Sequence, residues 1–122
     1  MRVLKTKLFQ HWTKEIDLMD QNLIDAVHEL KKGLYDAKLG GHIYKKRIAI
    51  NNQGKRGGAR TIIAFKAHDK AIFIYGYAKN KRSNITDKEE KALKALATEY
   101  FSYSETQINK AIKLGELIEV KS

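Results

Sequence analysis

The spacing of apolar residues changes twice along this chain, and that order limits the folds it can adopt. In residues 19–34 apolar side chains recur every three or four positions, which is the period of a helix buried on one face. Residues 43–78 hold three apolar runs rich in β-branched residues, which is typical of strands. Helical spacing returns in residues 86–114. Helices, then strands, then helices predict an α+β fold with a small antiparallel sheet packed against helices.

Three strands are expected in the middle of the chain, at Ile43–Ile50, Thr61–Lys66 and Ala71–Ala78. The last two are close enough in sequence to form a tight hairpin, with His68 at its tip. Residues Met1–Lys7 are expected to add a short edge strand.

The helix ends carry local signals. A short helix is expected at Leu8–Glu15, before the longer one. Thr86 followed by Glu89, and Ser104 followed by Gln107, have the spacing of capping boxes, in which each side chain accepts a hydrogen bond from the other residue's backbone N–H. Two further helices are therefore expected to begin just after Thr86 and Ser104.

Length and composition indicate one domain. The 122 residues contain no proline and no Ser/Gly-rich linker, so residues 1–122 are expected to fold as a single unit. There are no cysteines, which excludes disulfides and cysteine-bound zinc. No apolar run is long enough to cross a membrane, and no signal-peptide core follows Met1. A cytoplasmic protein with no membrane partner is expected.

The positive charge is concentrated in the middle third. Between Lys38 and Arg82 the sequence has twelve Lys and Arg residues but one acid, Asp69, whereas the rest has twelve basic and thirteen acidic residues. A mixed-sign surface would suffice for solubility. A one-signed segment indicates binding to a polyanion, with a merely solvated lysine-rich surface as the alternative.

Alternation along the strands sorts these cations into two groups. Lys46 shares a face with Ile48, which marks the core side, so Lys45 and Arg47 lie on the opposite face. Arg60 is predicted to join them from the next strand. Residues 51–58, between these two strands, are expected to form a glycine-rich loop. Its sequence lacks the GxxxxGK(S/T) motif of a nucleotide-binding P-loop.

The available side chains restrict the chemistry. The four histidines show no metal-ligand spacing, and the basic segment has a single carboxylate, so no metal site and no cofactor are expected. RNA can be cut without metal when its 2′-hydroxyl attacks the adjacent phosphate. A lysine among other cations has a lowered pKa and can accept the proton, while arginines clamp the phosphate.

Five stretches of the chain resemble the RelE/HigB family of type II toxin–antitoxin toxins, within the RelE/ParE superfamily. The stretches are FQHWTKE, LGGHIYKKRIA, GKRGGARTIIAF, IFIYGYAKN and GELIEV. The resemblance implies a RelE-like fold and an endoribonuclease that cuts mRNA on the ribosome. It also implies a helix-turn-helix antitoxin as partner, through which the toxin reaches operator DNA only indirectly.

The resemblance also implies which residues of this sequence form the functional site. The catalytic positions it implies are Lys45, Arg47, Lys55, Arg56, Arg60 and Lys79. The RNA-binding positions are Lys46, Asn80, Lys81 and Arg82. The best-known RelE members have an arginine after the lysine of the third strand and a tyrosine soon afterwards. Here those places hold Asn80 and, near Ile85, no tyrosine.

Two other functions fit the same features. One is a ParE-type gyrase poison without enzymatic activity, and the other is a non-catalytic RNA-binding protein. Tyr75 and Tyr77 are candidates for stacking on bases, but their mid-strand positions favour burial in the core.

Overall fold

The computed structural model describes residues 1–50 and 58–121. Its elements in chain order are β1 (Arg2–Thr6), α1 (Lys7–Glu15), α2 (Asp20–Lys31), β2 (Ala37–Gly40), β3 (Ile43–Ile48), β4 (Ala59–Lys66), β5 (Lys70–Ala78), α3 (Asp87–Ser102), α4 (Glu105–Lys113) and β6 (Leu117–Glu119). The strands form one six-stranded sheet in the order β2-β3-β4-β5-β1-β6. The predicted α+β class is confirmed. No helix among the described residues has the length and apolar character that a membrane span requires.

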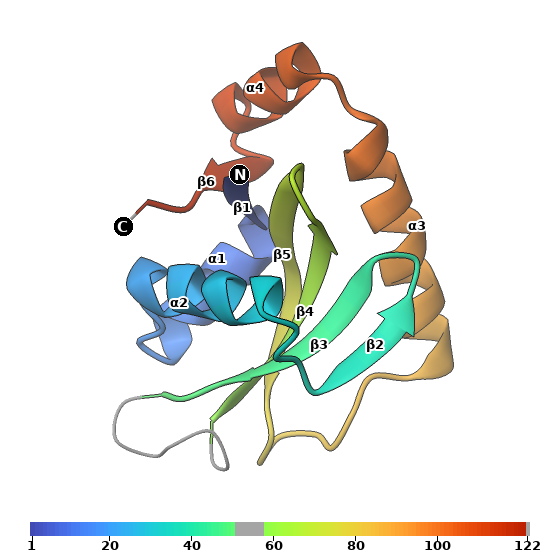
Figure 1. Ribbon diagram of the computed structural model, residues 1–122. Coiled ribbons are helices and arrows are strands. Elements are labelled where there is room, and N and C mark those ends of the chain that lie inside the picture. The colour runs from blue at the N-terminus through green and yellow to red at the C-terminus, as the bar shows by residue number, and fades with distance from the viewer. Residues whose placement is uncertain (51–57, 122) are drawn as a thin grey trace.

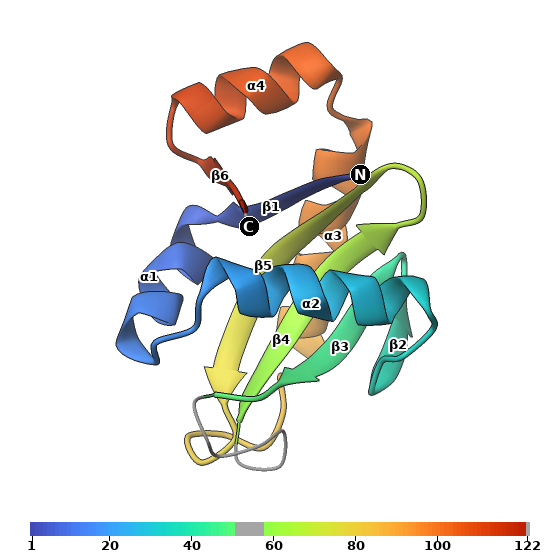
Figure 2. The same cartoon turned by 60° about the vertical axis from the view of Figure 1, so that its left-hand side comes forward.

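Helices cover both faces of the sheet. Figures 1 and 2 show α1 and α2 on one side and α3 on the other. The strand β4 therefore contributes to two cores. Ile63 and Phe65 pack with residues of α1 and α2, whereas Ile62 and Ala64 pack with residues of α3 and α4. Burial on both faces explains why residues 62–65 of β4 form an unbroken apolar run rather than an alternating one.

The three central strands lie where the sequence predicts them. β3, β4 and β5 form an antiparallel meander, with Arg47 opposite Arg60 and Arg60 opposite Tyr77. The β4–β5 hairpin turns at His68, whose φ of 64° is in the left-handed region. β3 ends at Ile48, two residues earlier than expected.

The N-terminal strand is not an edge strand, contrary to the sequence-based expectation. β1 pairs in parallel with β5 and antiparallel with β6, so it lies inside the sheet. One outer edge is β6, and the other is β2, a strand the sequence did not predict. β2 has four residues, none of them β-branched, and its register with β3 shifts between Lys38 and Gly40.

The expected helix starts are confirmed. The Thr86 hydroxyl accepts from the Glu89 N–H at 3.1 Å, and the Glu89 carboxylate accepts from the Thr86 N–H at 2.8 Å. Ser104 and Gln107 make the same reciprocal pair at the start of α4. These boxes satisfy backbone donors that have no partner within the helix.

Candidate nucleic-acid interface

Two strands bring their basic side chains together on the α3 side of the sheet. Lys45 and Arg47 share this face with Ile43, which packs in the α3-side core. Arg60 sits opposite Arg47 on the neighbouring strand. Alternation along the strands predicted this grouping. We call the following set the cationic cluster: Lys45, Arg47, Arg60, Lys79, Lys81 and Arg82.

Lys45 is held by an asparagine from the segment that follows β5. Its Nζ donates to Asn84 Oδ1 at 2.7 Å. The same oxygen accepts from the Ile85 backbone N–H at 2.8 Å and lies 3.5 Å from the Tyr77 hydroxyl. Asn84 therefore fixes the segment before α3 against β3 and β5, and it orients the Lys45 amine with a neutral acceptor.

Arg47 is oriented by a carboxylate at the start of β2. Its Nε donates to Asp36 Oδ1 at 2.7 Å, and its backbone N–H donates to Asp36 Oδ2 at 2.6 Å. The Arg47 side chain remains exposed despite this pair. Asp36 thus limits the motion of Arg47 without covering it.

Arg82 is bound more firmly than its predicted role as a phosphate contact suggests. Its guanidinium donates to both Glu89 oxygens, at 2.9 and 2.5 Å, and to the Tyr75 hydroxyl at 3.1 Å. It also lies 5.6 Å from the centre of the Tyr77 ring. The Arg82 hydrogen bonds and the Thr86 backbone N–H lower the pKa of Glu89 to about 2. The same carboxylate raises the pKa of Arg82.

The centre of the cluster is buried. Arg60 is 8% exposed and Tyr77 is 4% exposed. Burial raises the pKa of Tyr77, and the neighbouring Arg60 and Arg82 charges oppose that rise. Tyr77 therefore belongs to the core, as its mid-strand position indicated, and does not present a face for base stacking. Tyr75 is half-buried beside it.

Lys46 lies on the other side of the sheet, facing α2. It is 4% exposed, and its Nζ lies 2.6 Å from the Glu29 carboxylate. This position corrects the expectation of an RNA contact at Lys46, because its charge is enclosed and neutralised on the face away from the cationic cluster. Alternation along the strand predicted the sheet face on which Lys46 lies. It did not predict the ion pair with Glu29 of α2.

The remaining expected residues fall into two groups. Lys79, Asn80 and Lys81 form an exposed turn directly after β5, next to Arg82. Lys55 and Arg56 lie outside the described residues. Within residues 1–50 and 58–121, no three His, Asp or Glu side chains are close enough together to hold a metal ion.

Three residues of the interface were not anticipated: Asp36, Asn84 and Glu89. Glu89 was predicted only as a capping residue. Asp36 and Asn84 lie in irregular segments with no periodic pattern to place them. Each positions a cation of the cluster by a side-chain contact that depends on the tertiary fold.

A protein-family model covers nearly the whole chain. Residues 1–120 match the model described as the RelE toxin of the RelE / RelB toxin-antitoxin system. No curated protein matches the chain. The matched region includes every strand and helix of the described residues and every residue of the cationic cluster.

Proposed function

Because the chain belongs to the RelE family of toxins from toxin–antitoxin systems, we propose that it is an endoribonuclease that cuts mRNA on the ribosome without a metal ion. One observation carries the proposal: Lys45, Arg47 and Arg60 lie on one sheet face, with Arg47 directly opposite Arg60. Exposed Arg47 and half-buried Lys45 offer donors to a phosphate, and buried Arg60 adds positive charge behind them. The sequence-wide charge of +10 also favours a polyanionic partner.

The proposed reaction is an internal transfer within RNA. The 2′-oxygen forms a bond to the neighbouring phosphorus, and the bond from phosphorus to the 5′-oxygen of the next nucleotide breaks. One proton leaves the 2′-hydroxyl and one is delivered to the departing 5′-oxygen. The products are a 2′,3′-cyclic phosphate and a 5′-hydroxyl end. DNA lacks the attacking hydroxyl and is not a substrate.

We assign the proton acceptor to Lys45. Its amine is oriented by the amide oxygen of Asn84, a neutral group. Arg47 and Arg82, in contrast, each contact a carboxylate. The Lys45 amine is therefore held in place without an ion pair to a carboxylate of the described residues, and it faces the side of the sheet where Arg47 lies. Arg47, whose side chain is exposed, is assigned to the phosphate, where charge gathers in the transition state. Arg60 is 8% exposed and is assigned to the positive charge behind Arg47.

The partners follow from the family. A RelE-family toxin has an antitoxin, and we propose that this one is a helix-turn-helix protein that also binds operator DNA. We place the toxin in the cytoplasm, where translating ribosomes supply the mRNA.

The test is to map RNA ends in a translating extract. The wild-type protein is expected to produce new 5′-hydroxyl ends on translated mRNA. Lys45→Ala should lower the cleavage rate by about 10²–10⁴-fold, the usual contribution of a general base. Lys91→Ala is a matched control, because Lys91 is an exposed lysine on α3 and should leave the rate unchanged.

Two results would contradict different parts of the proposal. Intact mRNA in the presence of ribosomes and wild-type protein would exclude cleavage, and inhibition of gyrase supercoiling in the same preparation would then indicate a ParE-type poison. Equal cleavage by wild type and Lys45→Ala would remove Lys45 from the reaction but leave the endoribonuclease assignment in place.

A further inference from the structure

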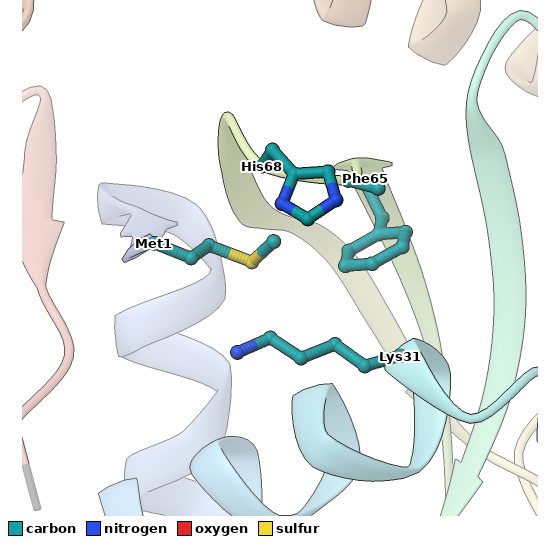
Figure 3. Close-up of a pocket in the computed structure, with 5 residues that line it drawn as sticks. Met1, Lys31, Phe65 and His68 are labelled. Carbon is teal, nitrogen blue, oxygen red and sulfur yellow. The ribbon is translucent and has the colours of Figure 1, made fainter.

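A pocket lies on the α2 side of the molecule, away from the cationic cluster. It has a volume of about 310 Å³ and is lined by Met1, Lys31, Phe65, Ala67 and His68. Figure 3 shows the four labelled side chains around the space, with Met1 facing the Phe65 ring across it and Lys31 facing the His68 ring. Three separate parts of the chain therefore form it: the N-terminus, the end of α2 and the β4–β5 hairpin. The volume suits one bulky apolar side chain.

The pocket continues into a row of aromatic rings. The Phe65 ring lies 5.9 Å from the Tyr44 ring, which in turn lies 5.0 Å from the Tyr35 ring. The outer end of this row is open to solvent, since Tyr35 is 41% exposed and the adjacent Leu34 is 54% exposed. At the pocket, Met1 is 46% exposed. Large apolar side chains grouped in this way mark a surface that binds another protein.

The charges along this surface are positive. Lys31 extends into the pocket, and the Lys38 Nζ lies 6.0 Å from the centre of the Tyr44 ring. Acids near this surface in the sequence are already paired: Glu29 with Lys46, Asp36 with Arg47, and Asp69 with Lys70. An acidic partner would therefore find complementary charge on both sides of the apolar row.

We propose that this surface binds the antitoxin, through an acidic segment that places one bulky apolar side chain in the pocket. We name it the α2-side surface, formed by Met1, Lys31, Leu34, Tyr35, Lys38, Tyr44, Phe65, Ala67 and His68. RNA fits it less well, because a phosphate backbone gains nothing from exposed Leu34 and Met1. The inference rests on the family's toxin–antitoxin pairing and not on RNA cleavage. It also implies that the antitoxin holds the toxin from the face opposite the cationic cluster.

The test compares antitoxin affinity between the full-length toxin and two surface variants. The probe is the antitoxin encoded beside the toxin, produced with it and separated under denaturing conditions. Ala67→Trp places a ring in the pocket and should weaken binding by about 30-fold, the effect of losing a central anchor. Lys31→Glu with Lys38→Glu should slow association by about tenfold at low salt, with a smaller difference at high salt.

The controls separate this site from the cleavage site and from loss of folding. Lys91→Glu changes charge by the same amount per site on α3 and should leave antitoxin affinity unchanged. Thermal unfolding shows whether Ala67→Trp folds. If Ala67→Trp does not fold, the double charge variant tests the surface alone, because it alters only exposed side chains.

Wild-type antitoxin affinity in both variants would overturn the proposal. The absence of a complex between the antitoxin and the wild-type toxin would overturn it as well. Reduced RNA cleavage with unchanged antitoxin affinity would overturn it too, since the surface would then contact RNA. Loss of cleavage by wild type, with antitoxin binding intact, would count only against the endoribonuclease assignment.

Discussion

Glu89 connects three parts of the interface through one carboxylate. It caps α3 at Thr86, it holds the Arg82 guanidinium, and through Arg82 it is linked to Tyr75. A capping residue near the start of a helix is common, but here the same group also determines where a cation of the cluster lies. The local sequence showed the first role and could not show the second.

The lowered pKa of Glu89 predicts a defined pH dependence of stability. Its folded-state pKa is about 2, against an ordinary value of 4.5. A depressed carboxyl pKa contributes stability that is fully present above about pH 4.5 and is lost as the pH falls toward 2. In urea titrations across that pH range, the free energy of unfolding should therefore fall more steeply for wild type than for Glu89→Gln. Glu90→Gln, one position further along α3, is the control and should follow wild type. Parallel curves for wild type and Glu89→Gln would contradict the assignment.

Lys46 and Glu29 form an ion pair that links β3 to α2. Removing Glu29 leaves an ammonium that is 4% exposed without its carboxylate. Glu29→Ala is therefore expected to lower the free energy of unfolding by about 2 kcal/mol, below the range for fully buried pairs because the Glu29 side chain is 36% exposed. Lys46→Met keeps the apolar stem and should cost less than Glu29→Ala in the same urea titration. The reverse order would show that packing, not charge, holds this contact.

At the level of helices and strands, the sequence predicted features that depend on nearby residues, such as helix starts. It did not predict which strands pair when they are far apart in the chain. Both capping boxes of α3 and α4 were readable because each involves residues three positions apart. The interior place of β1 was not, because it depends on pairing with β5 and β6 far along the chain. β2 has no β-branched residue, and it forms a strand because its backbone pairs with the free edge of β3.

The same distinction applies to the candidate site. Alternation alone placed Lys45, Arg47 and Arg60 on one face, because a strand has a fixed period of two. It could not find Asn84 or Asp36, which reach the cluster from irregular segments. Nor could it show that Arg60 is buried, since a strand end covered by neighbouring side chains looks the same in sequence as an open one.

Gly76 is required by the packing of α1 on β5. A Cβ at this position would lie 2.1 Å from Cζ3 of the Trp12 ring. Gly76→Ala should therefore displace Trp12 and destabilise the protein by about 1–3 kcal/mol, the usual effect of overpacking. Chemical unfolding followed by the fluorescence of Trp12, the single tryptophan, measures both the loss and the displacement.

A second substitution tests the cause. Trp12→Phe removes the six-membered ring atoms that the new methyl would meet. Gly76→Ala should therefore cost less in a Trp12→Phe background than in wild type, as measured by circular dichroism. Additive losses would mean that the strand, and not the ring contact, requires glycine.

For the molecule as a whole, the charge distribution predicts how RNA binding responds to salt. If Lys45 and Arg47 each contact a phosphate, the double variant Lys45→Ala with Arg47→Ala should reduce the slope of log K against log salt by about 2. Lys91→Ala with Lys113→Ala lowers net charge by the same amount and should leave the slope nearly unchanged, because both lysines are exposed on helices outside the cluster. Equal slopes for the two double variants would show that net charge, and not the cluster, governs binding.

The pairing of β1 with β6 also has a kinetic consequence. Leu4 lies opposite Glu119, and Arg2 is hydrogen-bonded to the same glutamate across 117 positions. Closing so long a segment raises the contact order of the native structure and slows folding. Until the last strand is present, β1 exposes an unpaired edge. We therefore expect a nascent or C-terminally shortened chain to remain vulnerable to proteases and to edge-to-edge aggregation, and the toxin to become resistant only when its two ends have met.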